Sequence, residues 1–120
     1  MNARETVLAW HTAVNAGDVE RLVDLLTEDV EVGGPRGSGS GQQLLRDWFA
    51  RAGVRLEPLR VFERDDLVVV EQSATWPDAP TQVVASAFSV RNGKVGRVVR
   101  YATVEEALRA EGLVGLLPGG

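Results

Sequence analysis

Cysteine is absent from the 120-residue sequence, which excludes disulfide bonds, zinc–thiolate sites, iron–sulfur clusters and cysteine nucleophiles. Long hydrophobic runs are absent as well, because no apolar stretch approaches the roughly 20 residues that a membrane-spanning helix needs. The first residues also lack the basic-then-apolar order of a signal peptide. From these absences we expect a cytoplasmic protein with no membrane partner.

Positive charge is scarce and scattered. The chain has 13 Lys and Arg residues against 17 Asp and Glu residues, which gives a formal net charge of −4. No stripe of basic residues suggests a surface for a phosphate backbone, so we expect no nucleic-acid partner.

The remaining composition is typical of one globular domain. Hydrophobic residues make up 44% and charged residues 25% of the chain, which excludes disordered and fibrous architectures. A chain of this length buries roughly two-thirds of its unfolded surface, enough for a core without cross-links. With no internal repeat and no linker, we expect a single domain over residues 1–120, with a frayed tail over residues 114–120.

The first 26 residues have the periodicity of two helices. Asn2 and Glu5 have the spacing of a capping box. The positions that follow at helical spacing form one face, made of Val7, Trp10, His11 and Val14. After the Asn15-Ala16-Gly17 turn, Asp18 predicts the start of a second helix whose buried side extends to Leu26. A short extended segment is expected at residues 30–32.

A glycine-rich segment over residues 33–41 separates the second helix from a third. It has five glycines and a proline in nine residues, so we expect a loop. Ser40 and Gln43 have capping-box spacing for the third helix, which Gly53 is expected to end. The loop fails the P-loop and dinucleotide templates, and we expect it to shape the mouth of a cavity.

The second half of the chain has the composition of strands. Four segments rich in β-branched and aromatic residues cover residues 56–63, 67–76, 82–90 and 95–102, and an Asn-Gly turn joins the last two. Thr103 predicts the start of a last helix over residues 104–111. This order predicts an α+β domain with three N-terminal helices packed on a curved antiparallel or mixed sheet. We expect a cone-shaped α+β barrel with an internal cavity.

The order of elements resembles the nuclear transport factor 2-like superfamily. The most telling residues are Asn15-Ala16-Gly17-Asp18, followed by Thr27-Glu28-Asp29-Val30, and the likeness covers about residues 5–113. The superfamily includes SnoaL-like polyketide cyclases, ketosteroid isomerases and limonene epoxide hydrolases. The resemblance implies the cone fold and a homodimer that forms through the sheet, with Val68 and Val70 available for that contact. It does not identify the function, because this fold carries isomerases, hydrolases, dehydratases and binding modules.

The catalytic groups of these relatives do not carry over to this chain. The resemblance places Trp10 where ketosteroid isomerases have an oxyanion-binding tyrosine, Gly34 at their aspartate base and Ser86 at their second donor. We therefore reject steroid isomerase activity of the usual kind. Arg100 matches an arginine of the epoxide hydrolases, but no two carboxylates can be placed beside it. The acid often found near the end of the last strand in SnoaL-like cyclases is absent from residues 99–103.

Four residues remain as weak catalytic candidates: His11, Asp47, Glu71 and Arg100. His11 is the only histidine, and its ordinary pKa near neutrality suits a general base. Adjacent helical residues point about 100° apart, so Trp10 and His11 cannot both face the centre of the cavity.

Strand alternation selects the side chains that face the cavity. If Ser86 faces inward, so do Val84, Phe88 and Val90, and on the last strand Val98, Arg100 and Ala102. Only one of Glu71 and Gln72 can point in. Arg100 has two interpretations: it forms a cross-strand pair with Glu71 on the outer face of the sheet, or it anchors a carboxylate or enolate in the cavity.

We expect five residues to contact a ligand: Trp10, Arg36, Trp48, Ser86 and Arg100. Arg36 in the glycine-rich segment either meets an anionic ligand or is solvated. The tryptophans belong equally to the core or to a cavity wall.

Two classes of function stay open. The first is a module that binds a small hydrophobic or aromatic molecule in a mostly apolar pocket. The alternative is an isomerase, polyketide cyclase or epoxide hydrolase-type enzyme that acts on a small hydrophobic substrate. Neither class needs a metal or an organic cofactor. The missing acids and bases at the family's catalytic positions favour the binding module.

Overall fold

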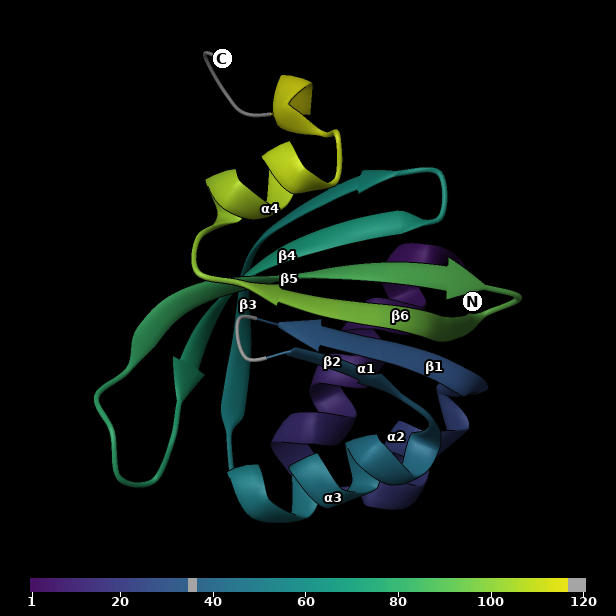
Figure 1. The fold of residues 1–120 in the computed structure, drawn as a ribbon, viewed down its shortest axis with the longest axis vertical. Coiled ribbons are helices and arrows are strands. Elements are labelled where there is room, and N and C mark those ends of the chain that lie inside the picture. The colour runs from purple at the N-terminus through teal and green to yellow at the C-terminus, as the bar shows by residue number, and fades with distance from the viewer. Residues whose placement is uncertain (35–36, 117–120) are drawn as a thin grey trace.

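A computed structural model describes residues 1–34 and 37–116 of the chain (Figure 1). Helix α1 (Ala3–Ala16) begins with the predicted capping box. The Asn2 side chain accepts a hydrogen bond from the Glu5 amide at 2.8 Å, and the Glu5 carboxylate accepts one from the Asn2 amide at 3.0 Å. Gly17 ends the helix in the left-handed region, with φ 71°. The start of the chain therefore forms as the sequence predicted.

Helix α2 (Val19–Asp24) is shorter than predicted. Asp18 caps it by accepting a hydrogen bond from the Arg21 amide at 3.1 Å. Leu26 was expected on this helix, but it is the first residue of strand β1 (Leu26–Gly34) and pairs with Val95. Its side chain is buried in either case, so the apolar pattern could not distinguish the two placements.

The glycine-rich segment is not the loop that we expected. Strand β2 (Gly37–Ser40) folds back antiparallel on β1, and Gly34 pairs with Gly37 while Glu31 pairs with Ser40. Glycine keeps its amide and carbonyl, so it can join a ladder wherever a neighbouring strand is present. Residues 35–36 lie outside the described residues.

The predicted capping box of helix α3 (Gln42–Ala52) is wrong. Its N-cap is Gly41, and no side chain forms a cap hydrogen bond there, because Ser40 belongs to β2. Gly53 ends the helix in the left-handed region, with φ 56°, as predicted.

The sheet contains the four predicted long strands: β3 (Arg55–Arg64), β4 (Leu67–Thr75), β5 (Gln82–Arg91) and β6 (Lys94–Tyr101). Its order is β2-β1-β6-β5-β4-β3, and every neighbouring pair is antiparallel except β1 and β6, which are parallel. The tight turns at Asp65 and Asn92 place both residues at φ 54°. The architecture is a curved, mixed sheet with helices, of the cone-shaped α+β kind that we expected.

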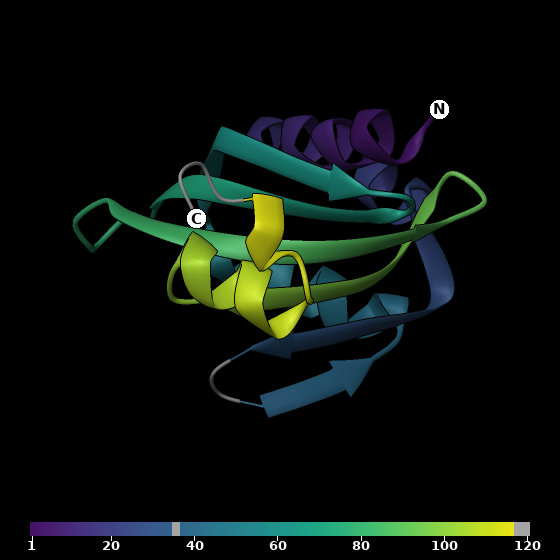
Figure 2. The same ribbon diagram turned by 90° about the horizontal axis from the view of Figure 1, so that it is seen from above.

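Helices lie on both faces of the sheet (Figure 2), and each face has its own hydrophobic core. Side chains of α1, α2 and α3 pack with the inner-face residues of the strands, among them Val68, Val70 and Phe88. Helix α4 (Val104–Ala110), capped by Thr103, packs on the outer face against Val69, Ala85 and Ala87, among others. Val68 and Val70 are fully buried, so the expectation that they are available for a dimer contact is wrong.

The C-terminal segment continues past α4. Residues Val114–Leu116 form a 3₁₀ helix, η1, where the sequence predicted the start of a frayed tail. Leu116 packs against the outer core, and residues 117–120 lie outside the described residues. None of the helices in the described ranges is long and apolar enough to span a membrane.

Candidate ligand cavity

A cavity of about 640 Å³ lies between the inner face of the sheet and the helices. Three tryptophans stand in its wall together with aliphatic residues and a few polar ones. The lining residues are Trp10, Val32, Gly33, Gly34, Gly37, Leu45, Trp48, Val54, Leu56, Gln72, Trp76, Gln82, Val84, Ser86, Val98 and Arg100.

Strand register determines which side chains reach this cavity. Ser86 pairs with Val70 on one side and with Arg100 on the other, so all three residues share the inner face. This confirms the predicted inward set of Val84, Ser86, Phe88 and Val90, all of which are buried. Ala102 follows the end of β6 and is exposed, so its predicted inward position is wrong.

The choice between Glu71 and Gln72 is settled in favour of Gln72. Gln72 is fully buried on the inner face, and Glu71 lies on the outer face. The Arg60 guanidinium on β3 donates two hydrogen bonds to Glu71, at 2.8 and 3.0 Å, and these lower the pKa of that carboxyl. The predicted pair between Arg100 and Glu71 is therefore wrong, because the register gives Glu71 a partner on β3 and turns Arg100 to the other face.

Arg100 and Trp76 form a charged corner of the cavity. The guanidinium carbon of Arg100 lies 4.9 Å from the centroid of the Trp76 ring, within the range of a cation–π contact. Trp76 was not among the predicted ligand contacts; it follows the last residue of β4. Its role depends on how the chain leaves the strand, and neither periodicity nor composition contains that information.

His11 is buried behind the cavity wall rather than in it. Its side chain is 1% exposed; Nδ1 lies 2.8 Å from the carbonyl oxygen of Val7, and Nε2 lies 2.8 Å from Nε2 of Gln72. Burial lowers the pKa of His11 from 6.5 to about 4, so the ring is neutral at pH 7. Gln72 in turn accepts a hydrogen bond from Ser86 Oγ at 2.9 Å. His11 is thus a positioning group for Gln72.

Trp10 occupies the cavity side of the same helix. Its ring lies 5.0 Å from the rings of both His11 and Phe88, in edge-on contacts. The indole Nε1 is buried and has no hydrogen-bond partner among the described residues. The expectation that only one of Trp10 and His11 faces the cavity is confirmed.

The predicted site residues divide into two groups. The structure places Trp10, Trp48, Ser86 and Arg100 in one cavity wall. It places Asp47 on the exposed side of α3, where its carboxylate accepts a hydrogen bond from Gln43 at 2.9 Å. Arg36 lies outside the described residues.

The cavity has few groups for proton transfer or metal binding. No Asp, Glu, His, Lys or Tyr is among its described lining residues, and Arg100 is the one charged residue there. Within the described part of the chain, no three His, Asp or Glu side chains are grouped so that they could hold a metal ion. The chemistry that the walls offer is apolar contact, hydrogen bonding and one positive charge.

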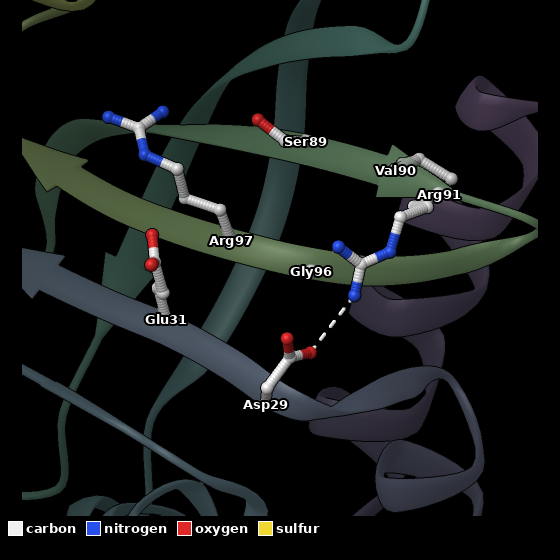
Figure 3. Close-up of a pocket in the computed structure, with 7 residues that line it drawn as sticks. All are labelled: Asp29, Glu31, Ser89, Val90, Arg91, Gly96 and Arg97. Carbon is white, nitrogen blue, oxygen red and sulfur yellow. Dashed lines mark hydrogen bonds and ion pairs between the residues drawn. The ribbon is translucent and has the colours of Figure 1, made fainter.

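A second, smaller hollow of about 270 Å³ lies on the outer side, between β1, β5 and β6 (Figure 3). Arg91 and Asp29 form an exposed ion pair across it, with 3.0 Å between Nη2 and Oδ1. Arg97 donates hydrogen bonds to the Glu111 carboxylate, at 2.8 and 3.2 Å. Charges of both signs already pair here, and the described residues that line the hollow include no aromatic ring, so we place the candidate site in the larger cavity.

A family model described as the SnoaL-like domain matches residues 7–101 of the chain. Similarity to solved structures extends over most of the molecule. An NTF2-like protein of unknown function from Cytophaga hutchinsonii superposes with a TM-score of 0.80 at 16% identity, covering 91% of this chain and 96% of that one.

Two further similar structures have names that mention a reaction or a bound compound. A candidate polyketide cyclase from Xanthomonas campestris has a TM-score of 0.73 at 24% identity, covering 89% of this chain and 94% of that one. TerC, co-crystallised with polyporic acid, has a TM-score of 0.76 at 21% identity, covering 94% and 98%. These identities establish a shared fold alone. Among curated protein sequences, none matches this chain.

Proposed function

The chain belongs to the SnoaL-like domain family, and from this premise we propose that it binds a small hydrophobic or aromatic molecule inside the cone. The observation that carries the proposal is the wall of the cavity, where Trp10, Trp48 and Trp76 stand among aliphatic side chains. A volume of about 640 Å³ lies within the range of small-molecule sites, which are mostly apolar with a few placed polar groups.

Binding without proton transfer fits this cavity better than catalysis. An isomerase, a cyclase or an epoxide hydrolase that needs no cofactor requires a side chain that takes or gives a proton within reach of the substrate. The described lining residues include no carboxylate and no imidazole, and His11 is neutral and separated from the cavity by Gln72. The enzymatic alternative would need a group from outside this set.

The charged corner extends the proposal to anionic ligands. Arg100 contributes a positive charge to an otherwise uncharged set of described lining residues, beside the ring of Trp76. TerC has the same fold and was co-crystallised with an organic acid. Both facts support a ligand whose aromatic body lies in the cavity and whose acidic group, where present, meets Arg100.

A filled-cavity variant tests the proposal. A Cβ atom built on Gly34 points toward the Cβ of Arg100, 3.6 Å away on the inner face. The backbone of Gly33 also lines the cavity, but a Cβ atom built on Gly33 points the other way and meets the Val99 side chain on the outer face. We expect calorimetry to show naphthalene binding to the wild type, a loss of about tenfold or more in Gly34→Leu, and unchanged affinity in Gly33→Leu.

The two glycines are neighbours in one strand, so the second variant controls for damage to the hairpin. Naphthalene that fails to bind the wild type, or that binds Gly34→Leu as tightly as Gly33→Leu, would contradict the proposal.

A further inference from the structure

The hydrogen-bond chain behind the cavity has one direction only. The carbonyl oxygen of Val7 can only accept, so Nδ1 of His11, 2.8 Å away, carries the hydrogen of the neutral ring. Nε2 of His11 is then an acceptor, and the atom of Gln72 that faces it at 2.8 Å is the amide nitrogen, which donates. Gln72 therefore turns its amide oxygen toward Ser86.

This direction determines what Ser86 presents to the cavity. The amide oxygen of Gln72 only accepts, so the single hydrogen of the Ser86 hydroxyl is donated to it, over 2.9 Å. His11, Gln72 and Ser86 are each at most 5% exposed, so breaking a link would leave a buried polar group without a partner. Toward the cavity, Ser86 offers lone pairs and no hydrogen.

The polarity of this position is the reverse of what the resemblance to ketosteroid isomerases implies. There, the matching position donates a hydrogen bond to a substrate oxygen. Here, a ligand oxygen that can only accept would find its lone pairs facing those of Ser86. A ligand hydroxyl group, by contrast, can donate its hydrogen to the lone pairs of Ser86 Oγ.

The aromatic side chain of Trp10 stands on the same wall as Ser86. Its indole N–H has no partner among the described residues, and its ring packs on Phe88, which shares the inner face of β5 with Ser86. A hydroxyl group has one hydrogen for an acceptor and lone pairs for a donor. A phenolic hydroxyl therefore matches the acceptor at Ser86 Oγ, and its ring matches the aromatic wall of the cavity.

We infer that the cavity takes a hydroxylated aromatic molecule of the phenol or naphthol class, with its hydroxyl group directed inward and donating to Ser86 Oγ. The inference rests on the proposed function, because it names the ligand class for the same cavity. It goes further because it requires the ligand to have a hydrogen-bond donor, which an ether or ketone of the same shape lacks.

The test compares two probes that differ in that hydrogen, 2-naphthol and 2-methoxynaphthalene, by calorimetry at pH 7, where 2-naphthol is neutral. In the wild type, 2-naphthol should bind about tenfold more tightly than 2-methoxynaphthalene, because the ether leaves the buried Ser86 oxygen without a donor. Ser86→Ala should lower the affinity for 2-naphthol to that for the ether and leave the ether unchanged, and Ser86→Thr should restore the preference.

Ser89→Ala is the matched control, because Ser89 lies on the same strand and lines the outer hollow; the preference should survive that change. Equal binding of both probes to the wild type, or a preference that persists in Ser86→Ala, would overturn the inference and leave the proposed function standing. A wild type that binds neither probe would overturn both.

Discussion

At the scale of single residues, burial determines what His11 can do. An imidazole enclosed by helix α1 and the sheet loses the solvation that its charged form needs, and its pKa falls to about 4. The same enclosure removes it from the list of general bases, since its Nε2 is occupied by Gln72. A histidine that looked like a catalytic candidate therefore orients a carboxamide.

The depressed pKa of His11 predicts a pH dependence of stability. Between pH 6.5 and about 4, the unfolded chain binds a proton that the folded chain does not, so stability is complete above this window and is lost as the pH falls through it. We expect the free energy of unfolding in urea to be about 2 kcal/mol lower at pH 5 than at pH 7.

His11→Gln should remove most of that difference, which identifies its source. The carboxyl groups of Glu71 and Glu111 also have lowered pKa values, but they lose stability only as the pH falls below their ordinary value of 4.5. Parallel pH profiles of wild type and variant between pH 5 and 7 would show that His11 is not the group responsible.

Arg100 predicts a charge preference of the cavity. We expect 2-naphthoate to raise the Tm of the wild type and Arg100→Leu to weaken its binding about fivefold, a modest loss because this arginine is exposed to solvent. Arg91→Leu removes an equally charged side chain from the outer hollow and should change nothing. If 2-naphthoate raises the Tm of wild type and Arg100→Leu equally, Arg100 does not contact the ligand.

At the scale of elements, the start of each helix depends on a different chemistry. The cap of α2 is the carboxylate of Asp18, whereas α3 starts at Gly41 without a side-chain cap. Asp18→Ala should therefore lower the free energy of unfolding by about 1 kcal/mol, and Ser40→Ala by less than about 0.5 kcal/mol. Equal losses in urea unfolding of the two variants would mean that Ser40 does cap α3.

The sequence predicted helices and turns correctly where the hydrophobic periodicity agreed with a capping or turn motif. The capping box at Asn2 and the Asn-Gly turn between β5 and β6 were found because the signal lies within four residues. The β1–β2 hairpin was missed because its glycines have the composition of a loop, although each glycine keeps the amide and carbonyl that a ladder needs. Composition does not show which backbone amides and carbonyls find a partner.

The same distinction applies to the candidate site. Strand alternation predicted that Ser86 and Arg100 share a face, and the register confirms it. The choice of Gln72 over Glu71 required the partner of Glu71 on β3, and the buried chain from His11 to Ser86 required helix α1 to be placed on the sheet. Contacts between residues 61 positions apart have no signal in a single sequence.

At the scale of the whole molecule, the sheet separates two hydrophobic cores that have different structural roles. The inner core surrounds the cavity, and the outer core, under α4, only supports the sheet. Leu108→Ala, in the fully buried outer core, should lower the free energy of unfolding by about 3 kcal/mol. Calorimetry at a temperature where the variant is folded should give an unchanged naphthalene affinity, and a large loss of affinity would show that the two cores are coupled.

The homodimer through the sheet stays a prediction. With Val68 and Val70 inside the cone, any contact through the sheet has to use the outer face, part of which α4 already covers. Light scattering distinguishes a monomer of 13.0 kDa from a particle of twice that mass.

The central claim is that the space between the sheet and the N-terminal helices holds a ligand. The most direct measurement is a crystal structure after soaking with 2-bromonaphthalene, with the bromine located by its anomalous scattering. We expect a bromine peak inside the volume bounded by Trp10, Trp48 and Ser86. A peak confined to the outer surface, or a cavity filled by side chains with no ligand in it, would show that this space is not a ligand site.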